Sequence, residues 1–263
     1  NLKFNRSVVG MDLGLSGKVA IVTGGAKGIG AGICRCLVQE GATVVVNTHS
    51  NDEMSQAFCA DLAKTGTVLA IQGDVSKEDD VSAIFKSAVD AFGRVDVLVN
   101  NAGVTDGYPI DKMTLAQWHR VVDTNLTGTF LMCREMVRLC RKTKKGGAIV
   151  NILSKAAVSS TTKGRTAYNA SKAGGLGFTK ALAGEVIGDG IRVNGVLPGF
   201  VRNSRTDKLF ETDFEAMEIK RKRLPTQQFG MPEDIGVMVA MLASEKCKLA
   251  IGSIVDMTGG LLL

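Results

Sequence analysis

Hydrophobic and polar positions along the chain form two kinds of segment, short continuous apolar runs and longer stretches with helical spacing. The short runs are rich in Val, Ile and Leu, which is typical of strands buried on both faces of a parallel sheet. These runs predict strands at residues 18–23, 42–47, 67–72, 95–100, 147–152, 191–196 and 253–257. The longer stretches predict helices at residues 28–40, 52–64, 77–92, 115–123, 125–142, 166–187 and 232–243.

Strands and helices alternate along almost the whole chain, so the sequence predicts an α/β fold with a doubly wound parallel sheet, a Rossmann fold. The 263 residues suit one large domain, and no linker-like stretch or repeat divides them. Residues 202–229 are polar and less regular, and we expect them to cover a substrate. Residues 1–10 precede Met11 and are interpreted as a natural extension or an expression remnant, which leaves 11–263 as the catalytic domain.

The first predicted strand runs into a glycine-rich turn, TGGAKGIG, that opens directly into a helix. Glycines let the backbone turn sharply and approach a ligand closely, and a helix N-terminus offers unpaired N–H groups to a phosphate. This position in a strand–turn–helix unit is typical of a dinucleotide pyrophosphate site. The predicted cofactor contacts from the turn are Gly24, Lys27, Gly28, Ile29 and Gly30.

The TGxxxGIG form of this turn resembles that of the short-chain dehydrogenases/reductases, and further motifs of that family follow in the same order. They are GDV at 73–75, NNAG at 100–103, TNLTG around Asn125, NILS ending at Ser154, YNASK from Tyr168 to Lys172, and PG at 198–199. The resemblance extends from about residue 15 to the end of the chain. Within the family, the chain is most similar to 3-oxoacyl-[acyl-carrier-protein] reductases and acetoacetyl-CoA reductases.

Four residues form the predicted catalytic group. Tyr168 and Lys172 are four positions apart on one predicted helix, so they share a face. A neighbouring ammonium and a positive nicotinamide ring are expected to lower the phenol pKa from its usual value of about 10. The resemblance implies that Ser154 holds the substrate oxygen. Asn125 lies near a predicted helix start, where it would cap the helix; the resemblance adds a water that it positions beside Lys172.

The end of the second predicted strand bears on the choice of nicotinamide. NAD-binding folds usually place a carboxylate there for the ribose 2′-OH, but this chain has Thr48, followed by His49 and Ser50. Without a carboxylate to repel a 2′-phosphate, and with Lys27 in the glycine turn to attract it, the sequence favours NADP(H). Asp52 reaching back to the ribose is the alternative, and it keeps NAD(H) open.

The family resemblance also implies cofactor contacts beyond the glycine turn. Asp74 and Val75 are expected to flank the adenine, and His49 and Ser50 are assigned to the same end of the cofactor. The other expected contacts come from the ends of later strands and from the catalytic helix: Asn101, Ala102, Gly103, Tyr168, Lys172, Pro198, Gly199 and Val201.

The resemblance implies an oxidoreductase that moves a hydride between a nicotinamide and a carbonyl or secondary alcohol. The preferred substrate is a 3-oxoacyl thioester of CoA or an acyl carrier, or a similar β-keto compound. Arg202, Arg205 and Lys208 could steer its phosphate. Gly184 and Asp189 stand where carrier-binding relatives have basic residues. A sugar, polyol, steroid or other small alcohol therefore remains the alternative substrate. A catalytically silent cofactor-binding regulator is the non-enzymatic alternative, and the presence of Tyr168 disfavours it.

Composition excludes several other classes. The six cysteines are scattered and form no CxxC pair, which predicts reduced thiols, no metal site and a cytoplasmic location. The net charge of +6 comes from basic clusters without interleaved aromatics, so we expect no nucleic-acid partner. No apolar run approaches the roughly 20 residues that span a bilayer, and no membrane association is expected. The resemblance implies a homotetramer.

Overall fold

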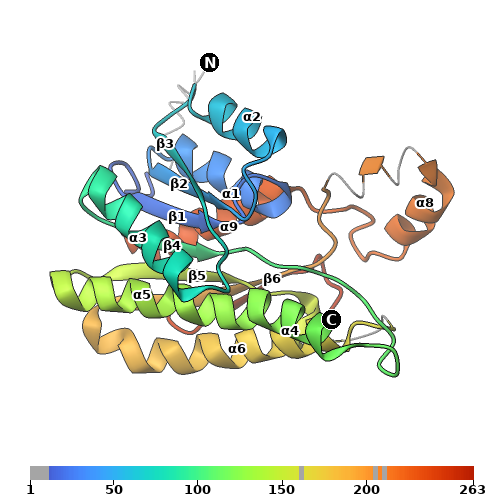
Figure 1. Ribbon diagram of the computed structural model, residues 1–263. Coiled ribbons are helices and arrows are strands. Elements are labelled where there is room, and N and C mark those ends of the chain that lie inside the picture. Colours follow the sequence, from blue (N-terminus) through green and yellow to red (C-terminus); the bar gives the residue numbers. More distant parts are fainter. Residues whose placement is uncertain (1–11, 160–162, 204–206, 209–211) are drawn as a thin grey trace, which may run out of the picture.

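The computed structural model describes residues 12–159, 163–203, 207–208 and 212–263. Seven parallel strands form one sheet in the order β3-β2-β1-β4-β5-β6-β7 (Figure 1). The strands are β1 (Val19–Thr23), β2 (Thr43–Thr48), β3 (Val68–Gln72), β4 (Val97–Asn100), β5 (Gly147–Ile152), β6 (Ile191–Pro198) and β7 (Ile254–Met257). The order reverses direction between β1 and β4, so the predicted doubly wound, single-domain α/β fold is confirmed. Residues 1–10 lie outside the described residues.

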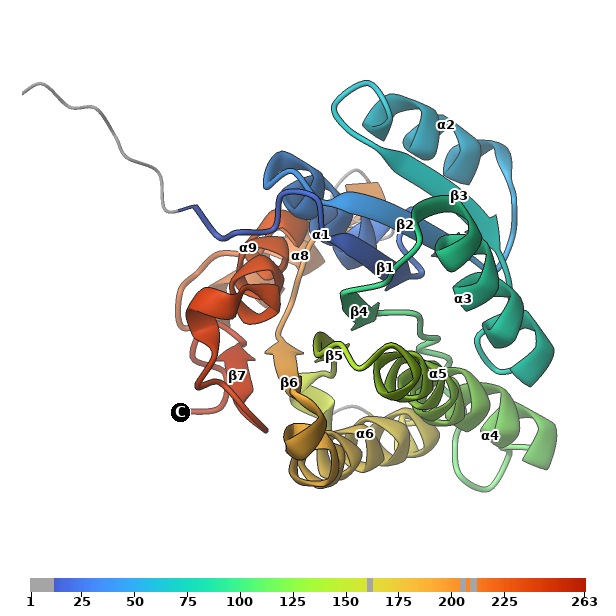
Figure 2. The same ribbon diagram turned by 90° about the vertical axis from the view of Figure 1, so that its left-hand side faces the viewer.

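Helices cover both faces of the sheet (Figure 2). One face carries α1 (Gly28–Gln39), α2 (Glu53–Leu62) and α9 (Pro232–Ala243). The other carries α3 (Glu78–Phe92), α5 (Gly128–Thr143) and α6 (Thr166–Val186). Neighbouring residues of a central strand therefore enter different cores. In β1, Ala20 and Val22 face the α1 side, while Val19 and Ile21 face the α5 side. This burial on both faces explains why the strands are continuous apolar runs in the sequence.

The predicted helices 115–123 and 125–142 are joined into one. A π-helical turn, Asp123–Thr127, connects α4 (Leu115–Val122) to α5 without a break in the helical backbone. The extra residue in such a turn changes where side chains project from the helix, and π-turns are frequent at functional sites. Here the turn contains Asn125, whose side chain is buried.

The polar segment 202–229 contains a helix that the apolar pattern does not predict, α8 (Phe214–Lys222). Only Met217 of this helix is buried, so no apolar stripe marks it in the sequence. Its stabilisation is local instead: Asp213 caps it by accepting from the Ala216 N–H, and three basic residues occupy its last turn, where they complement the helix dipole. A bridge between Val201 and Gly230 closes the segment that carries α8.

All six cysteine thiols are free, and five of them are buried. Burial raises the pKa of the Cys133 thiol to about 12, so it stays protonated and unreactive. Among the described residues no cluster of His, Cys, Asp and Glu side chains could hold a metal ion. In the same part of the chain, no helix is long and apolar enough to cross a membrane.

Candidate active site

The glycine-rich turn lies between β1 and α1 and is fixed to the end of β4. The Thr23 hydroxyl accepts from the backbone N–H groups of Asn101 and Ala102, each at 3.0 Å. In return, the Asn101 side chain donates to the backbone oxygens of Thr23 and Gly24. A Cβ on Gly30 would lie 2.2 Å from the Gly24 oxygen, so only glycine lets the turn close on the helix. Sequence reasoning gave Thr23 no role.

The remaining residues of the turn differ in their surroundings. Gly28 begins α1 with a φ of +52°, a left-handed conformation that side chains rarely adopt. Ile29 is half-buried against the core on the α1 side. Lys27 precedes the helix and is exposed. The turn therefore presents a cationic side chain and the free N–H groups of the α1 N-terminus on one side, which suits a phosphate.

A cavity of about 440 Å³, called the Lys27 cavity below, opens beside this turn. Of the predicted cofactor contacts, Gly24, Lys27, His49, Ser50, Asp74, Val75, Ala102 and Gly103 line it. His49 lies 4.0 Å from the Asp74 carboxylate. Burial opposes ionisation of Asp74, but hydrogen bonds from the Ser76 backbone and hydroxyl outweigh it and hold the pKa of Asp74 below its usual range.

The alternative role considered for Asp52 is not the one that the structure gives it. Asp52 caps α2, and one of its carboxylate oxygens accepts from the Ser55 N–H at 2.8 Å. The other accepts from the Ser50 hydroxyl at 2.9 Å. The hydrogen bond from the Ser55 backbone is the main reason that the pKa of Asp52 is lowered. Asp52 does not line the Lys27 cavity.

The predicted catalytic residues of α6 lie at the carboxyl ends of β5 and β6. The Lys172 ammonium is buried and donates to the Ile152 backbone oxygen at 2.8 Å. It lies 5.9 Å from the centre of the Tyr168 ring, which is half-buried. Ser154, just beyond β5, is close enough to Tyr168 to favour its phenolate. The structure therefore brings Ser154, Tyr168 and Lys172 together.

The expectation that Lys172 lowers the pKa of Tyr168 is wrong for the protein without a ligand. Burial raises the pKa of Tyr168, while Ser154 and Arg165 act in the opposite direction and only partly offset it. Lys172 is not among the causes. Its own pKa is lowered to about 8, because burial removes water from the ammonium. The phenol is therefore protonated at neutral pH.

Asn125 is not a helix cap, which corrects the positional interpretation of this residue. Its Oδ1 accepts from the Val104 N–H at 2.8 Å, and its Nδ2 donates to the Val104 oxygen at 3.0 Å. Nδ2 also donates to the Ser171 hydroxyl at 3.1 Å. Ser171 in turn donates to the Tyr168 backbone oxygen. Asn125 thus joins the loop after β4 to the catalytic helix, and Ser171 is a link that sequence reasoning missed.

The remaining predicted contacts lie beyond β6. Gly199 follows Pro198 and donates to the Met257 oxygen at the end of β7. A Cβ on Gly199 would lie 2.7 Å from the Thr258 oxygen, so the close approach of these strand ends requires glycine. Val201 is buried and forms the bridge to Gly230.

The basic residues expected to steer a phosphate are only partly described. Arg202 is engaged with Asp207, with its Nε 2.9 Å from the carboxylate. Lys208 is exposed. Arg205 lies outside the described residues. Asp189, which stands where carrier-binding relatives have a basic residue, pairs with Arg141.

A second cavity, of about 410 Å³ and called the Tyr168 cavity below, is lined by Ser154 and Tyr168 together with Lys155, Arg165, Phe200 and Lys220. The last four were missed by sequence reasoning. Arg165 precedes Tyr168 by three residues, and its guanidinium lies 5.9 Å from the centre of that ring. Helical spacing could have identified Arg165. Lys220 belongs to α8, and nothing in the sequence connects it to Tyr168.

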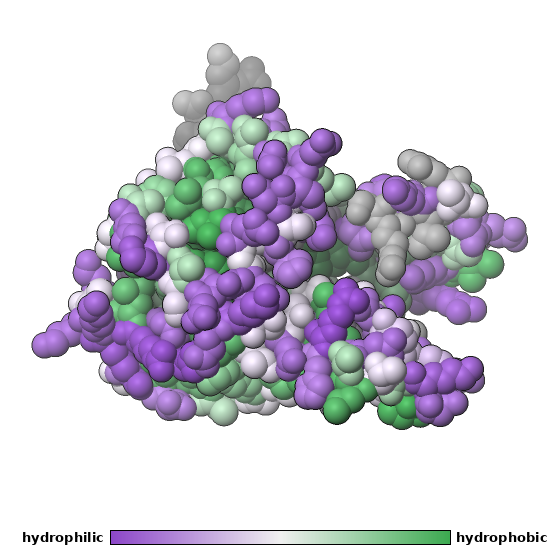
Figure 3. All heavy atoms as spheres, in the orientation of Figure 1, coloured by the Kyte–Doolittle hydropathy of each residue, from purple (hydrophilic) through white to green (hydrophobic). Residues whose placement is uncertain are grey.

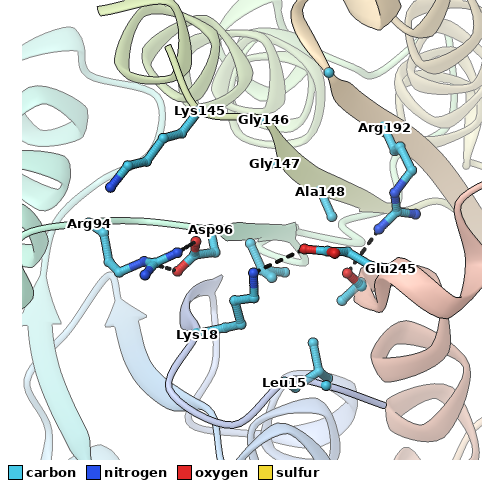
Figure 4. A pocket seen from close by; sticks show the side chains of 14 residues that line it. Leu15, Lys18, Arg94, Asp96, Lys145, Gly146, Gly147, Ala148, Arg192 and Glu245 are labelled. Carbon is cyan, nitrogen blue, oxygen red and sulfur yellow. Dashed lines mark hydrogen bonds and ion pairs between the residues drawn. The ribbon is translucent and has the colours of Figure 1, made fainter. Parts of the chain in front are cut away.

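A third cavity, of about 310 Å³ and called the Arg192 cavity, lies at the opposite edge of the sheet, beside the amino ends of the strands (Figure 4). Several of its charged side chains form ion pairs with one another. Lys18 pairs with Glu245 at 3.1 Å, and the Arg94 Nε donates to Asp96 at 2.8 Å. Arg192 donates to backbone oxygens at the end of α9. We interpret this cavity as structural.

Comparisons with known proteins identify the family of this chain. The family model for short chain dehydrogenases matches residues 18–213. A 3-oxoacyl-[acyl-carrier-protein] reductase from Synechocystis sp. is 36% identical, with 95% of this chain and 98% of that protein covered. A 3beta-hydroxysteroid dehydrogenase 1 from Eggerthella lenta is also 36% identical, with 95% of each covered. The crystal structure of a putative short-chain alcohol dehydrogenase from Sinorhizobium meliloti superposes with a TM-score of 0.87 at 33% identity, covering 94% of this chain and 97% of that one.

Proposed function

This chain belongs to the short-chain dehydrogenase family of oxidoreductases, and on that premise we propose that it is an NADP(H)-dependent reductase of a 3-oxoacyl thioester or a similar β-keto compound. The proposal rests on two groups of residues that lie together at the carboxyl edge of the sheet. One is the glycine turn with Lys27, and the other is the group of Ser154, Tyr168 and Lys172.

In this proposal Tyr168 is the proton donor to the carbonyl oxygen during reduction. Burial keeps its phenol protonated at neutral pH, which is the form that a donor needs. The Ser154 hydroxyl, in the same cavity, donates to the substrate oxygen and holds it in place for the transfer. Arg165 lies against the Tyr168 ring and favours the phenolate that remains after the proton has left.

Lys172 and Asn125 have supporting roles. The buried Lys172 ammonium is fixed beside the Tyr168 ring by its hydrogen bond to the Ile152 oxygen, where it would hold the nicotinamide ribose, as the family resemblance implies. Asn125 is a positioning residue, because its amide fixes the loop after β4 against Ser171 on the catalytic helix. The water that the family resemblance assigns to Asn125 would lie between this amide and Lys172.

The residues present fit a dinucleotide. Gly24 has a φ of +60°, and a Cβ there would lie 3.0 Å from the Ala102 Cα, so glycine is what lets the turn pack closely on the loop after β4. Residues of the turn would hold the pyrophosphate, and His49, Ser50, Asp74 and Val75 would surround the adenosine. The nicotinamide, when bound, supplies the hydride for the reduction.

The preference for NADP(H) rests on the Lys27 cavity. Asp52, the carboxylate closest in sequence to the end of β2, is occupied in capping α2. Lys27, by contrast, lines the cavity together with Ser50. An exposed ammonium at this position favours a 2′-phosphate over a free hydroxyl.

The test compares NADPH and NADH in the reduction of acetoacetyl-CoA. We expect a higher kcat/KM with NADPH, and Lys27→Ala should reduce that preference by about 10- to 150-fold, since a charged hydrogen bond contributes about 1.5–3 kcal/mol. Lys64→Ala, which removes an exposed lysine of the α2 region, is the matched control and should leave the ratio unchanged. A preference for NADH, or a ratio that Lys27→Ala does not alter, would contradict the assignment.

The proposal that the substrate is a thioester is supported by the Synechocystis relative, which is named a 3-oxoacyl-[acyl-carrier-protein] reductase. If the protein turned over a steroid or a sugar but not acetoacetyl-CoA, the proposed substrate class would be wrong, whereas the family assignment would be unaffected. The homotetramer stays a prediction. Phe130 on α5 and Ile187 at the end of α6 are exposed apolar side chains that contacts between subunits would cover.

A further inference from the structure

Three cationic side chains from different parts of the chain meet at the Tyr168 cavity. Lys155 directly follows Ser154, Arg165 lies one helical turn before Tyr168, and Lys220 comes from α8. All three are half-buried. Among the described residues no Asp or Glu lines this cavity. The three cations also form no ion pair within the described part of the chain.

Phe200 holds two of these cations in place without neutralising them. The Lys220 ammonium lies 4.5 Å from the centre of the Phe200 ring, and the Lys155 ammonium lies 5.2 Å from it. An aromatic face attracts a cation through its quadrupole but adds no negative charge. Arg165 is fixed separately, by a hydrogen bond from its guanidinium to the Thr105 backbone oxygen. The positive charges are therefore positioned and remain available to a ligand.

The arrangement has an electrostatic cost in the absence of a ligand. Burial lowers the pKa of Lys220, and the neighbouring charges of Lys155 and Arg165 lower it further. Like charges that are held together in a half-buried cavity disfavour one another, and an anion between them relieves this repulsion. Figure 3 shows the side chains of the α8 region standing away from the body of the molecule, with a hollow between them and the loops below.

We propose that Lys155, Arg165 and Lys220 bind an anionic group of the substrate, a carboxylate or a phosphate, in the cavity that holds the reacting carbonyl. This rests on the proposed reductase function and narrows its substrate class. Two kinds of substrate could supply this anion, and they carry it at different distances from the reacting carbonyl. A small 3-oxo acid carries its carboxylate a few bonds from the carbonyl, whereas a CoA or carrier thioester carries the phosphate of its pantetheine arm much farther away.

The test uses two pairs of ketones that share a reacting group and differ in charge. Acetoacetate is compared with methyl acetoacetate, and acetoacetyl-CoA with acetoacetyl-N-acetylcysteamine, each as a substrate for NADPH oxidation. The wild type should prefer the anionic member of one pair by about 10-fold or more in kcat/KM. A preference within the first pair identifies a carboxylate, and a preference confined to the second identifies the pantetheine phosphate.

Variants connect that preference to the cavity. Lys220→Met should reduce the anionic-to-neutral ratio by about 10-fold, and Lys155→Met should do the same from a different element. Lys222→Met is the matched control, because Lys222 is an exposed lysine of the same helix that does not line the cavity; it should leave the ratio unchanged. Equal kcat/KM within both pairs, or a ratio that neither lysine affects, would overturn the inference and leave the reductase function intact.

A binding measurement separates this inference from the proposed function. Calorimetry with 3-hydroxybutyrate and its methyl ester, on the NADP⁺-saturated protein, requires no turnover. If no ketone oxidises NADPH, the reductase function fails, and the calorimetry still decides whether the cavity binds anions. Tighter binding of the acid than of the ester, lost in Lys220→Met, supports the anion site. Equal binding of the acid and the ester rules out a carboxylate, and the anion site is overturned if 3-hydroxybutyryl-CoA also binds no more tightly than 3-hydroxybutyryl-N-acetylcysteamine.

Discussion

The two edges of the sheet contain similar cationic residues and use them differently. At the amino edge, Lys18 and Arg94 are paired with carboxylates, and Arg192 donates to backbone oxygens at the end of α9 (Figure 4). Asp96 at this edge accepts from the Val19 N–H as well, so its charge also ties β1 to the strand beside it. Lys18, Arg94, Asp96 and Glu245 at the amino edge are thus held in ion pairs.

Four cations at the carboxyl edge have no carboxylate partner within the described residues: Lys172, Lys155, Arg165 and Lys220. Lys172 is buried with a backbone oxygen as its hydrogen-bond acceptor, and the three cations of the Tyr168 cavity lack a carboxylate. Placing charge in a poorly solvated site without a counterion costs stability. We infer from the contrast that the amino edge stabilises the fold, and that the carboxyl edge trades stability for a site that binds anionic ligands.

The largest expected effect is at the carboxyl edge. Tyr168→Phe removes the transferable proton and leaves the ring, so kcat should fall by about 10²–10⁴-fold or more. The fold and NADPH binding should be retained. The chain has one other tyrosine, Tyr108, and Tyr108→Phe is the matched control with kcat near that of the wild type. Retention of more than about a tenth of wild-type kcat by Tyr168→Phe would remove Tyr168 from its assigned role.

At the amino edge a substitution should affect stability rather than turnover. Arg192 is only 9% exposed, and its loss in Arg192→Met leaves the backbone oxygens of Leu242 and Ala243 without their donor. The unfolding free energy, measured with urea, should fall by about 2 kcal/mol. Lys18→Met should cost less than about 1 kcal/mol, because the Glu245 partner is exposed. A large loss of kcat/KM in Arg192→Met without a loss of stability would contradict the conclusion that the amino edge stabilises the fold.

Much of the fold could be predicted, and the glycine turn recognised, because the signals are local. Continuous apolar runs mark strands such as β1 and β4, which are buried on both faces. The glycine turn is recognisable because closing it requires specific residues, as the 2.2 Å contact at Gly30 demonstrates. The group of Ser154, Tyr168 and Lys172 was predicted for the same reason, since its spacing is carried by one strand end and one helix.

The features that could not be predicted depend on tertiary contacts or on solvation. Helix α8 has a cap and charged turns but no apolar stripe, so its pattern resembles that of a loop. Lys220 reaches Phe200 only after the chain has folded back. The direction of the Tyr168 pKa was also predicted wrongly, because the sequence shows the neighbouring Lys172 but not the burial of the phenol.

Whether the carboxyl edge keeps a buried, uncompensated charge is tested by the stability of the protein at different pH values. Burial lowers the pKa of Lys172 to about 8, against about 10.4 for an unperturbed lysine. Below pH 8 the amine is protonated in both the folded and the unfolded chain, so it adds no pH dependence. Between pH 8 and 10 the folded chain releases the proton and the unfolded chain retains it. The unfolding free energy therefore rises with pH in this window.

The decisive measurement is the unfolding free energy of the wild type and of Lys172→Met, without cofactor, at intervals from pH 7 to pH 10. We expect the unfolding free energy of the wild type to rise by about 2–3 kcal/mol relative to that of the variant between pH 8 and pH 10, because each pH unit contributes up to about 1.4 kcal/mol. Other titrating groups are common to both proteins and cancel in the difference. Parallel curves for the two proteins would contradict an uncompensated Lys172.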